Sequence, residues 1–113
     1  MGIARGEFVD ELIEVLGEDR AIDLAEAFGG TRLYVANSVT ANRRIVKAMG
    51  QDIAVALMEG FAPSVIKVPL LRERRAARYR NEGLSNGQIA TRLVMTESGI
   101  ERMFRRLAED QPS

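Results

Sequence analysis

One stretch of this chain occurs twice, and this repeat constrains the fold more than any other feature of the sequence. Residues 17–35, GEDRAIDLAEAFGGTRLYV, align without a gap on residues 50–68, GQDIAVALMEGFAPSVIKV. Seven of the 19 aligned pairs are identical, among them Phe28 with Phe61. We therefore predict an internal duplication in which both copies fold in the same way.

Each copy combines a helical pattern with a short strand pattern, and one copy alone has no partner for its strand. We expect the strand at 31–36 to pair antiparallel with the strand at 64–68, while the helices of both copies cover one face. The strands can pair within one chain or between two chains. The residues expected to shape this ribbon or an oligomer interface are Gly29, Gly30, Leu33, Tyr34, Val35, Ile66 and Val68.

Helical periodicity covers most of the remaining residues up to position 68. Residues 7–16, EFVDELIEVL, form an amphipathic helix pattern whose apolar side is expected to face the core. Asp19 and Asp52 stand where helix N-caps are expected. Phe28 and Phe61 are predicted to anchor the core, because large aromatic side chains at repeated positions usually pack inside.

The side chains that many enzymes and metal sites need are missing. The chain has no Cys and no His, which excludes disulfides, thiolate or imidazole ligands and Ser-His-Asp catalysis. The repeated carboxylates Glu26 and Glu59 are better explained as helix-surface residues than as catalytic acids. No apolar run approaches the ~18 residues of a membrane span, and no signal-peptide pattern opens the chain. We expect a cytoplasmic protein without catalysis, cofactor, metal or small-molecule substrate.

Charge divides the chain although the formal net charge is zero. Residues 1–60 carry 6 basic and 10 acidic side chains, and residues 61–113 carry 10 basic and 6 acidic ones. A basic C-terminal part is typical of a chain that meets a polyanion there. We predict two regions, a duplicated oligomerisation region at 1–68 and a nucleic-acid-binding region at 69–113.

The second region begins with an arginine-rich helix pattern between Pro69 and Gly83. Ser85 is then expected to cap a helix at 86–93, and Thr96 to cap a second helix at 97–107. Only Val94 and Met95 separate the two. This spacing predicts a helix-turn-helix, in which the second helix enters the major groove of DNA. The turn departs from the usual pattern because Val94 stands where glycine is common.

On this interpretation the second helix reads bases and its surroundings hold the backbone. Arginine can bond guanine, Ser and Thr can contact bases or phosphate, and Glu can accept from cytosine. The predicted base-facing residues are Thr96, Glu97, Ser98, Glu101, Arg102 and Arg105. The predicted backbone contacts, beside the arginine-rich helix, are Asn86, Arg92 and Arg106.

These features together resemble the Mor transcription activator family of phages and prophages. The resemblance is carried by LAEAFGGTRLYV at 24–35 and by RYRNEGLSNGQIATRLVMTESGIERMFRR near the C-terminus. It implies a homodimeric DNA-binding activator that binds an imperfect dyad near a promoter and recruits RNA polymerase. It also implies that Gly29, Gly30 and Tyr34 shape the entry to the strand.

The expected fold is mainly α-helical, with a short two-stranded antiparallel ribbon and a C-terminal helix-turn-helix. The expected function is sequence-specific binding of double-stranded DNA in transcription regulation. Two other functions stay open at this point. One is a phage-type DNA packaging or assembly adaptor, and the other is a protein-interaction module whose arginines meet an acidic partner.

Overall fold

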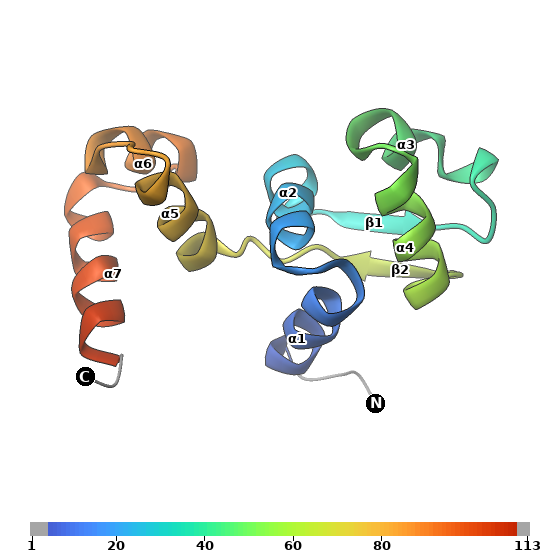
Figure 1. Ribbon diagram of the computed structural model, residues 1–113, viewed down its shortest axis with the longest axis horizontal. Coiled ribbons are helices and arrows are strands. Elements are labelled where there is room, and N and C mark those ends of the chain that lie inside the picture. The colour runs from blue at the N-terminus through green and yellow to red at the C-terminus, as the bar shows by residue number, and fades with distance from the viewer. Residues whose placement is uncertain (1–4, 111–113) are drawn as a thin grey trace. The chain divides into compact units, whose positions relative to one another are not determined.

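The computed structural model describes residues 5–110, which form seven α-helices, one short 3₁₀ helix and two strands (Figure 1). The chain divides into two compact units, Met1–Leu71 and Arg72–Ser113. A mainly helical fold with one two-stranded antiparallel ribbon was predicted and is confirmed. No helix within residues 5–110 is long and apolar enough to cross a membrane.

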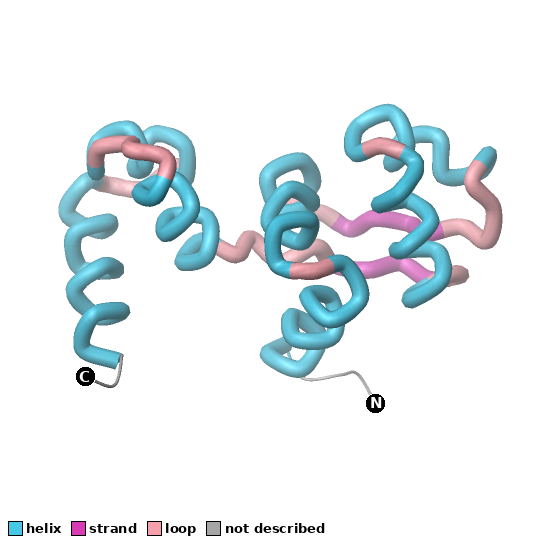
Figure 2. Tube along the Cα trace, in the orientation of Figure 1, coloured by secondary structure: helices cyan, strands magenta, loops and turns pink. Residues whose placement is uncertain are grey.

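The first unit contains four α-helices around the ribbon, with both strands lying side by side (Figure 2). Its elements are α1 (Arg5–Leu16), α2 (Glu18–Phe28), β1 (Arg32–Val35), the 3₁₀ helix η1 (Thr40–Asn42), α3 (Arg43–Met49), α4 (Gln51–Phe61) and β2 (Ser64–Lys67).

Single glycines join α1 to α2 and α3 to α4 without any loop. Gly17 (φ 87°, ψ 157°) and Gly50 (φ 92°, ψ 164°) have nearly the same backbone conformation, which favours glycine. Each glycine N–H closes the last turn of the helix before it, and each glycine C=O opens the first turn of the next helix. The prediction that Asp19 and Asp52 are N-caps is therefore wrong. Both lie inside the first turn of their helix, where the helix dipole stabilises a carboxylate.

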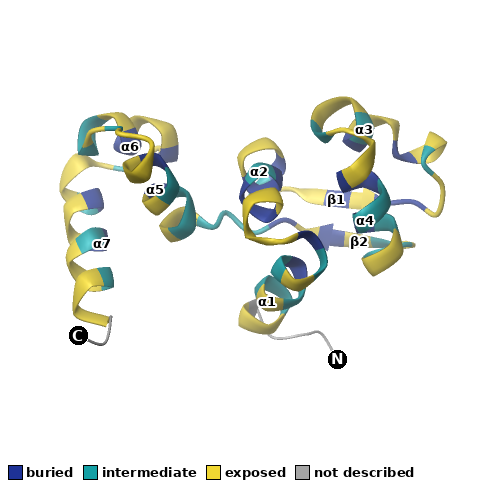
Figure 3. Ribbon diagram, viewed as in Figure 1, coloured by how far each residue is buried: buried dark blue, intermediate teal, exposed yellow. Residues whose placement is uncertain are grey.

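The ribbon separates its side chains as predicted. Leu33 pairs with Ile66, and both are buried, whereas Tyr34 pairs with Val65, and these are 59% and 60% exposed. The strands pair within one chain. One face of the ribbon therefore contributes to the core, and the other remains open (Figure 3).

The core of the first unit comes from every helix as well as the ribbon. Its fully buried members include Leu12 of α1, Leu24 of α2, Ile45 of α3 and Leu57 of α4. Burying a side chain of this size contributes roughly 1.5–3 kcal/mol. A two-stranded ribbon alone is marginal, so these helices supply most of the stabilisation.

The two repeated aromatic residues differ in their surroundings. Phe28 is buried as predicted, and the Arg44 guanidinium lies 5.2 Å from the centre of its ring. Phe61 is only half-buried and packs at the edge of the core against Phe8, with ring centres 5.6 Å apart. The prediction of a core anchor is thus only partly right for Phe61, because α4 ends there and one side of the ring faces a groove.

The chain stays with the first unit beyond β2, to Leu71. The Gly30 N–H donates to Val68 O (2.8 Å), the Leu70 side chain lies against Gly30, and Leu71 packs on the core. Gly30 has a φ of 82°, a left-handed backbone conformation that favours glycine. The prediction that a helix starts at Pro69 is wrong, since these contacts hold the chain until the helix begins at Arg72.

Among residues 5–110, Asn42 is a polar residue whose side chain is buried, and its role was not predicted. Its side-chain amide donates from Nδ2 to Ala36 O (2.9 Å) and accepts at Oδ1 from Ala36 N (2.8 Å). These two bonds satisfy the backbone of Ala36, directly after β1, as a neighbouring strand would. The fold around η1 therefore depends on this one amide.

Replacing Asn42 by Ala should destabilise the first unit by about 2–3 kcal/mol, because it leaves a buried N–H and C=O at Ala36 unsatisfied. Asn37→Ala is the matched control, since Asn37 is exposed; its effect should stay within about 0.5 kcal/mol. Urea unfolding followed by circular dichroism measures both. Equal stability of the two variants would show that the Asn42 bonds are replaceable.

Candidate nucleic-acid interface

The second unit consists of three helices, α5 (Arg72–Asn81), α6 (Asn86–Leu93) and α7 (Glu97–Asp110). Gly83, with φ 94°, ends α5 as predicted, and its N–H bonds Arg80 O at 3.0 Å. The next N–H, that of Leu84, reaches back to Tyr79 O, also at 3.0 Å. This pair of bonds is a helix C-cap that turns the chain sharply towards α6.

A small apolar core holds the three helices together. The predicted apolar positions of α6 and α7 lie in it: Ile89, Leu93, Ile100 and Met103 are buried and Met95 packs against them. Its buried residues are Ala76, Tyr79, Ile89, Ala90, Leu93, Ile100 and Met103. Ala90 of α6 is a small member of this core and is 5% exposed.

Both predicted caps are present. The Ser85 hydroxyl accepts from the Gln88 N–H (3.2 Å), and the Gln88 side chain accepts from the Ser85 N–H (2.8 Å), a reciprocal capping box. Thr96 Oγ1 accepts from the Gly99 N–H at 3.0 Å. The start of each helix is thus encoded locally. Only the end of α7 differs from the prediction, at Asp110 instead of Leu107.

The joint between α6 and α7 has an unusual backbone at Val94. Its φ of 55° and ψ of 51° place this β-branched residue in the left-handed region, where glycine is usual. The conformation allows the Met95 N–H to bond Ala90 O (2.9 Å) and close the end of α6. The Val94 side chain is 89% exposed and therefore gains nothing from packing. Val94 thus forms the turn that glycine usually forms, at a cost in strain.

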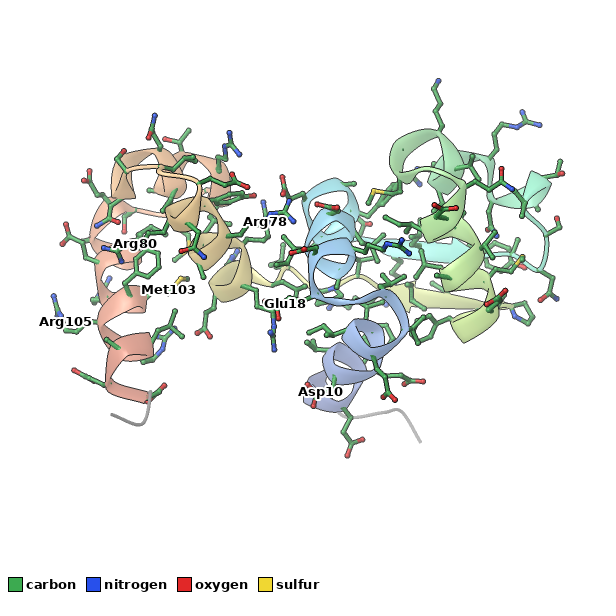
Figure 4. All side chains as sticks on the ribbon, viewed as in Figure 1. Asp10, Glu18, Arg78, Arg80, Met103 and Arg105 are labelled. Carbon is green, nitrogen blue, oxygen red and sulfur yellow. The ribbon has the colours of Figure 1, made fainter. Side chains whose placement is uncertain are left out.

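The outer face of α7 carries the predicted base-facing residues. All six are exposed: Thr96, Glu97, Ser98, Glu101, Arg102 and Arg105. Figure 4 shows Arg105 directed away from the unit, on the opposite side of α7 from the buried Met103. A helix with one apolar side held by its neighbours and one polar side open to solvent can enter a groove of nucleic acid without unfolding.

Glu97 differs from the others in its surroundings. A Cβ at Gly87, in the first turn of α6, would lie 3.6 Å from Glu97 Oε2. The carboxylate therefore stands near the first turns of two helices, where the helix dipoles favour a negative charge. This placement accounts for Glu97 on a face of α7 that carries two carboxylates and two arginines.

Two contacts link α5 to α7 at the surface. Arg106 Nη2 lies 2.6 Å from Glu73 Oε1, with both side chains about half exposed. The Arg80 guanidinium lies 4.2 Å from the centre of the Phe104 ring. Arg106, predicted to contact the DNA backbone, is thus paired with a carboxylate and offers a partly neutralised charge.

Two arginines gather around one buried tyrosine, an arrangement that was not predicted. The Tyr79 side chain is buried, with the guanidinium of Arg92 5.1 Å and that of Arg75 6.0 Å from the ring centre. Arg75 Nε also donates to the Tyr79 hydroxyl at 3.3 Å. Stacking on the ring orders the Arg92 guanidinium and leaves its N–H groups available. The four-residue spacing of Arg75 and Tyr79 was visible in the sequence, but Arg92 comes from another helix.

The residues predicted for strand pairing lie elsewhere, in the ribbon of the first unit. Leu33, Val35, Ile66 and Val68 are buried there, and only the Tyr34 side chain is well exposed. Within residues 5–110, no group of three or more acidic side chains could hold a metal ion. No family model matches this chain, and neither does any curated protein or solved structure compared with it.

Replacing Val94 by Gly should stabilise the second unit by roughly 0.5–1 kcal/mol. The left-handed backbone costs a non-glycine residue roughly 1–2 kcal/mol, and glycine removes this cost. Glycine also has more conformational freedom in the unfolded chain, which cancels about half of the stabilisation. Ala77→Gly, at an exposed position within α5, is the control and should destabilise by about 1 kcal/mol. Thermal unfolding followed by NMR signals of α5–α7 measures both. A destabilised Val94→Gly variant would show that Val94 makes a favourable contact.

Proposed function

We propose that this protein binds double-stranded DNA sequence-specifically and regulates transcription, as its resemblance to the Mor family implies. The DNA-binding element is the second unit, with α6 and α7 as a helix-turn-helix. The first unit serves oligomerisation, and the regulator acts as a homodimer on a dyad near a promoter, where it contacts RNA polymerase.

The arrangement of α6 and α7 is the observation that carries this proposal. Two capped helices meet at a two-residue joint, and the second buries Ile100 and Met103 while its other side stays polar. Such packing fixes the angle of the second helix, which is the requirement for placing it in a major groove. A plain helical hairpin needs no arginines on its outer face, whereas Arg102 and Arg105 stand there exposed.

The charged residues divide into two roles on this proposal. Arg102 and Arg105 on α7 are placed to bond base edges, since guanidinium groups pair well with guanine. Arg92, ordered against Tyr79, is placed to bond phosphates. Glu97 lies at the starts of α6 and α7, where the helix dipoles favour its charge.

Two features of the first unit support the proposal of an internal duplication. The order helix, glycine, helix, strand occurs twice, and the two joining glycines have matching backbone angles. Each half supplies one strand of a single ribbon, which neither could form alone. Because β1 and β2 pair within one chain, the proposed homodimer forms through a surface other than these paired strand edges.

Arg102→Ala and Arg105→Ala should each weaken binding to the preferred duplex by about 1–3 kcal/mol and relax the preference at one base position. Selection from a random duplex pool, repeated with each variant, measures this effect. Arg43→Ala, at an exposed arginine of α3, is the control and should select the same sequence as the unchanged protein. Identical selections by all proteins would exclude α7 as the reading helix. Absence of duplex binding at low salt would favour an acidic protein partner.

Arg92→Ala should weaken binding to every duplex alike and reduce the slope of log K against log salt by about 1, because one phosphate contact is lost. Arg92→Lys keeps the charge and should keep the slope. A salt titration with a fluorescent duplex gives both values. Weaker binding with an unchanged slope would mean that Arg92 acts only through its packing on Tyr79.

A further inference from the structure

A groove of about 880 Å³ lies in the first unit between α1 and β2. One wall carries Phe8 and Val9 of α1, and Phe61 at the end of α4 closes part of it. The other wall is the whole of β2, continued by the chain as far as Leu70. The Phe8 and Phe61 rings contact each other, so the aromatic part of the groove is already formed.

The β2 side of the groove presents unpaired backbone groups. Val68 N donates to Thr31 O, so Val68 bonds towards β1, and by antiparallel alternation Ile66 and Ser64 do the same. The N–H and C=O groups of Val65 and Lys67 therefore point to the other edge. No strand within residues 5–110 covers that edge, because the sheet there consists of β1 and β2. An open edge of this kind is a template for another strand.

The β1 side of the ribbon has one backbone contact, at Ala36, that the β2 side lacks. Beside β1, the Asn42 amide makes two hydrogen bonds to the Ala36 backbone, as described above. If the 33-residue offset of the repeats is continued beyond the aligned residues, Asn42 corresponds to Val9 and Ala36 to Pro69, and both of these line the groove. Val9 has no side-chain amide and Pro69 has no backbone N–H, so this pair cannot make the two bonds. The groove is thus apolar at the positions where the β1 side carries an amide.

Two opposite charges line the groove: Lys67 of β2 is exposed, whereas the Glu11 carboxylate is half-buried. Glu11 of α1 lines the groove and is half-buried, and no ion pair or hydrogen bond joins its side chain to another residue within 5–110. A nearby cation stabilises the charged form of a half-buried carboxylate. The apolar walls disfavour a phosphate backbone.

We propose that the groove binds an extended segment of a partner protein, which adds to β2 as a third strand. The segment has apolar side chains facing Phe8, Val9 and Phe61 and one Lys or Arg facing Glu11. Its backbone bonds Val65 and Lys67, which gives affinity independent of side chains, and the groove gives selectivity. The volume is that of a cleft for one short segment, which favours a peptide over a second folded copy. This site is separate from the DNA-binding residues.

Selection of random seven-residue peptides displayed on phage against the full chain tests the proposal. Selected peptides should contain alternating apolar residues and one Lys or Arg. Their synthetic forms should bind at least tenfold more weakly to Val65→Pro, which removes an edge donor without removing a bond to β1. Val65→Thr keeps the N–H and should bind as the unchanged protein does. Circular dichroism establishes that each variant is folded.

Glu11→Lys provides a second test that does not touch the strand. It should reverse the charge preference, so that a peptide with Glu in place of its basic residue becomes the better ligand. Selected peptides that bind all variants equally would overturn the proposal, and so would a selection without enrichment. Self-association of the full chain that Val65→Pro abolishes, measured by sedimentation, would assign the groove to a second copy instead and would equally overturn it.

Discussion

The pairing of two four-residue strands holds the first unit together. Leu33 meets Ile66 across the ribbon, and this contact brings residues from the two repeats into one core. The ribbon is too short to be stable alone, and its helices cannot bury their apolar sides without it. Strand pairing and helix packing therefore form together or not at all. The groove, the Asn42 bonds and the continuation to Leu71 all depend on this common framework.

Features encoded by a few neighbouring residues were predictable from the sequence. The caps at Ser85 and Thr96 and the alternation along β1 follow from local hydrogen bonding and side-chain period. The predictions failed where distant residues or a competing local signal decided the outcome. The N-cap of α2 is Gly17 and not Asp19, because the positive φ of Gly17 lets one residue end a helix and begin the next.

Contacts between elements were the least predictable part of the candidate interface. The predicted α7 residues are exposed as expected, but their electrostatic surroundings come from other helices. Arg106 meets Glu73 of α5, and Arg92 meets Tyr79 of the same helix. Neither spacing is a recognisable sequence signal, since each pair is joined only by the packing of the three helices. Which arginines keep their full charge is therefore a tertiary property.

The glycine joints also determine where the first unit tolerates change in length. Because α2 follows Gly17 directly, one added residue there would rotate the helix by about 100° and turn Leu24 away from the core. The same holds for α4 after Gly50. The segment between β1 and η1 is fixed in length too, because the Asn42 amide bonds back to Ala36 across it. The helix pairs and this turn therefore behave as parts of fixed length.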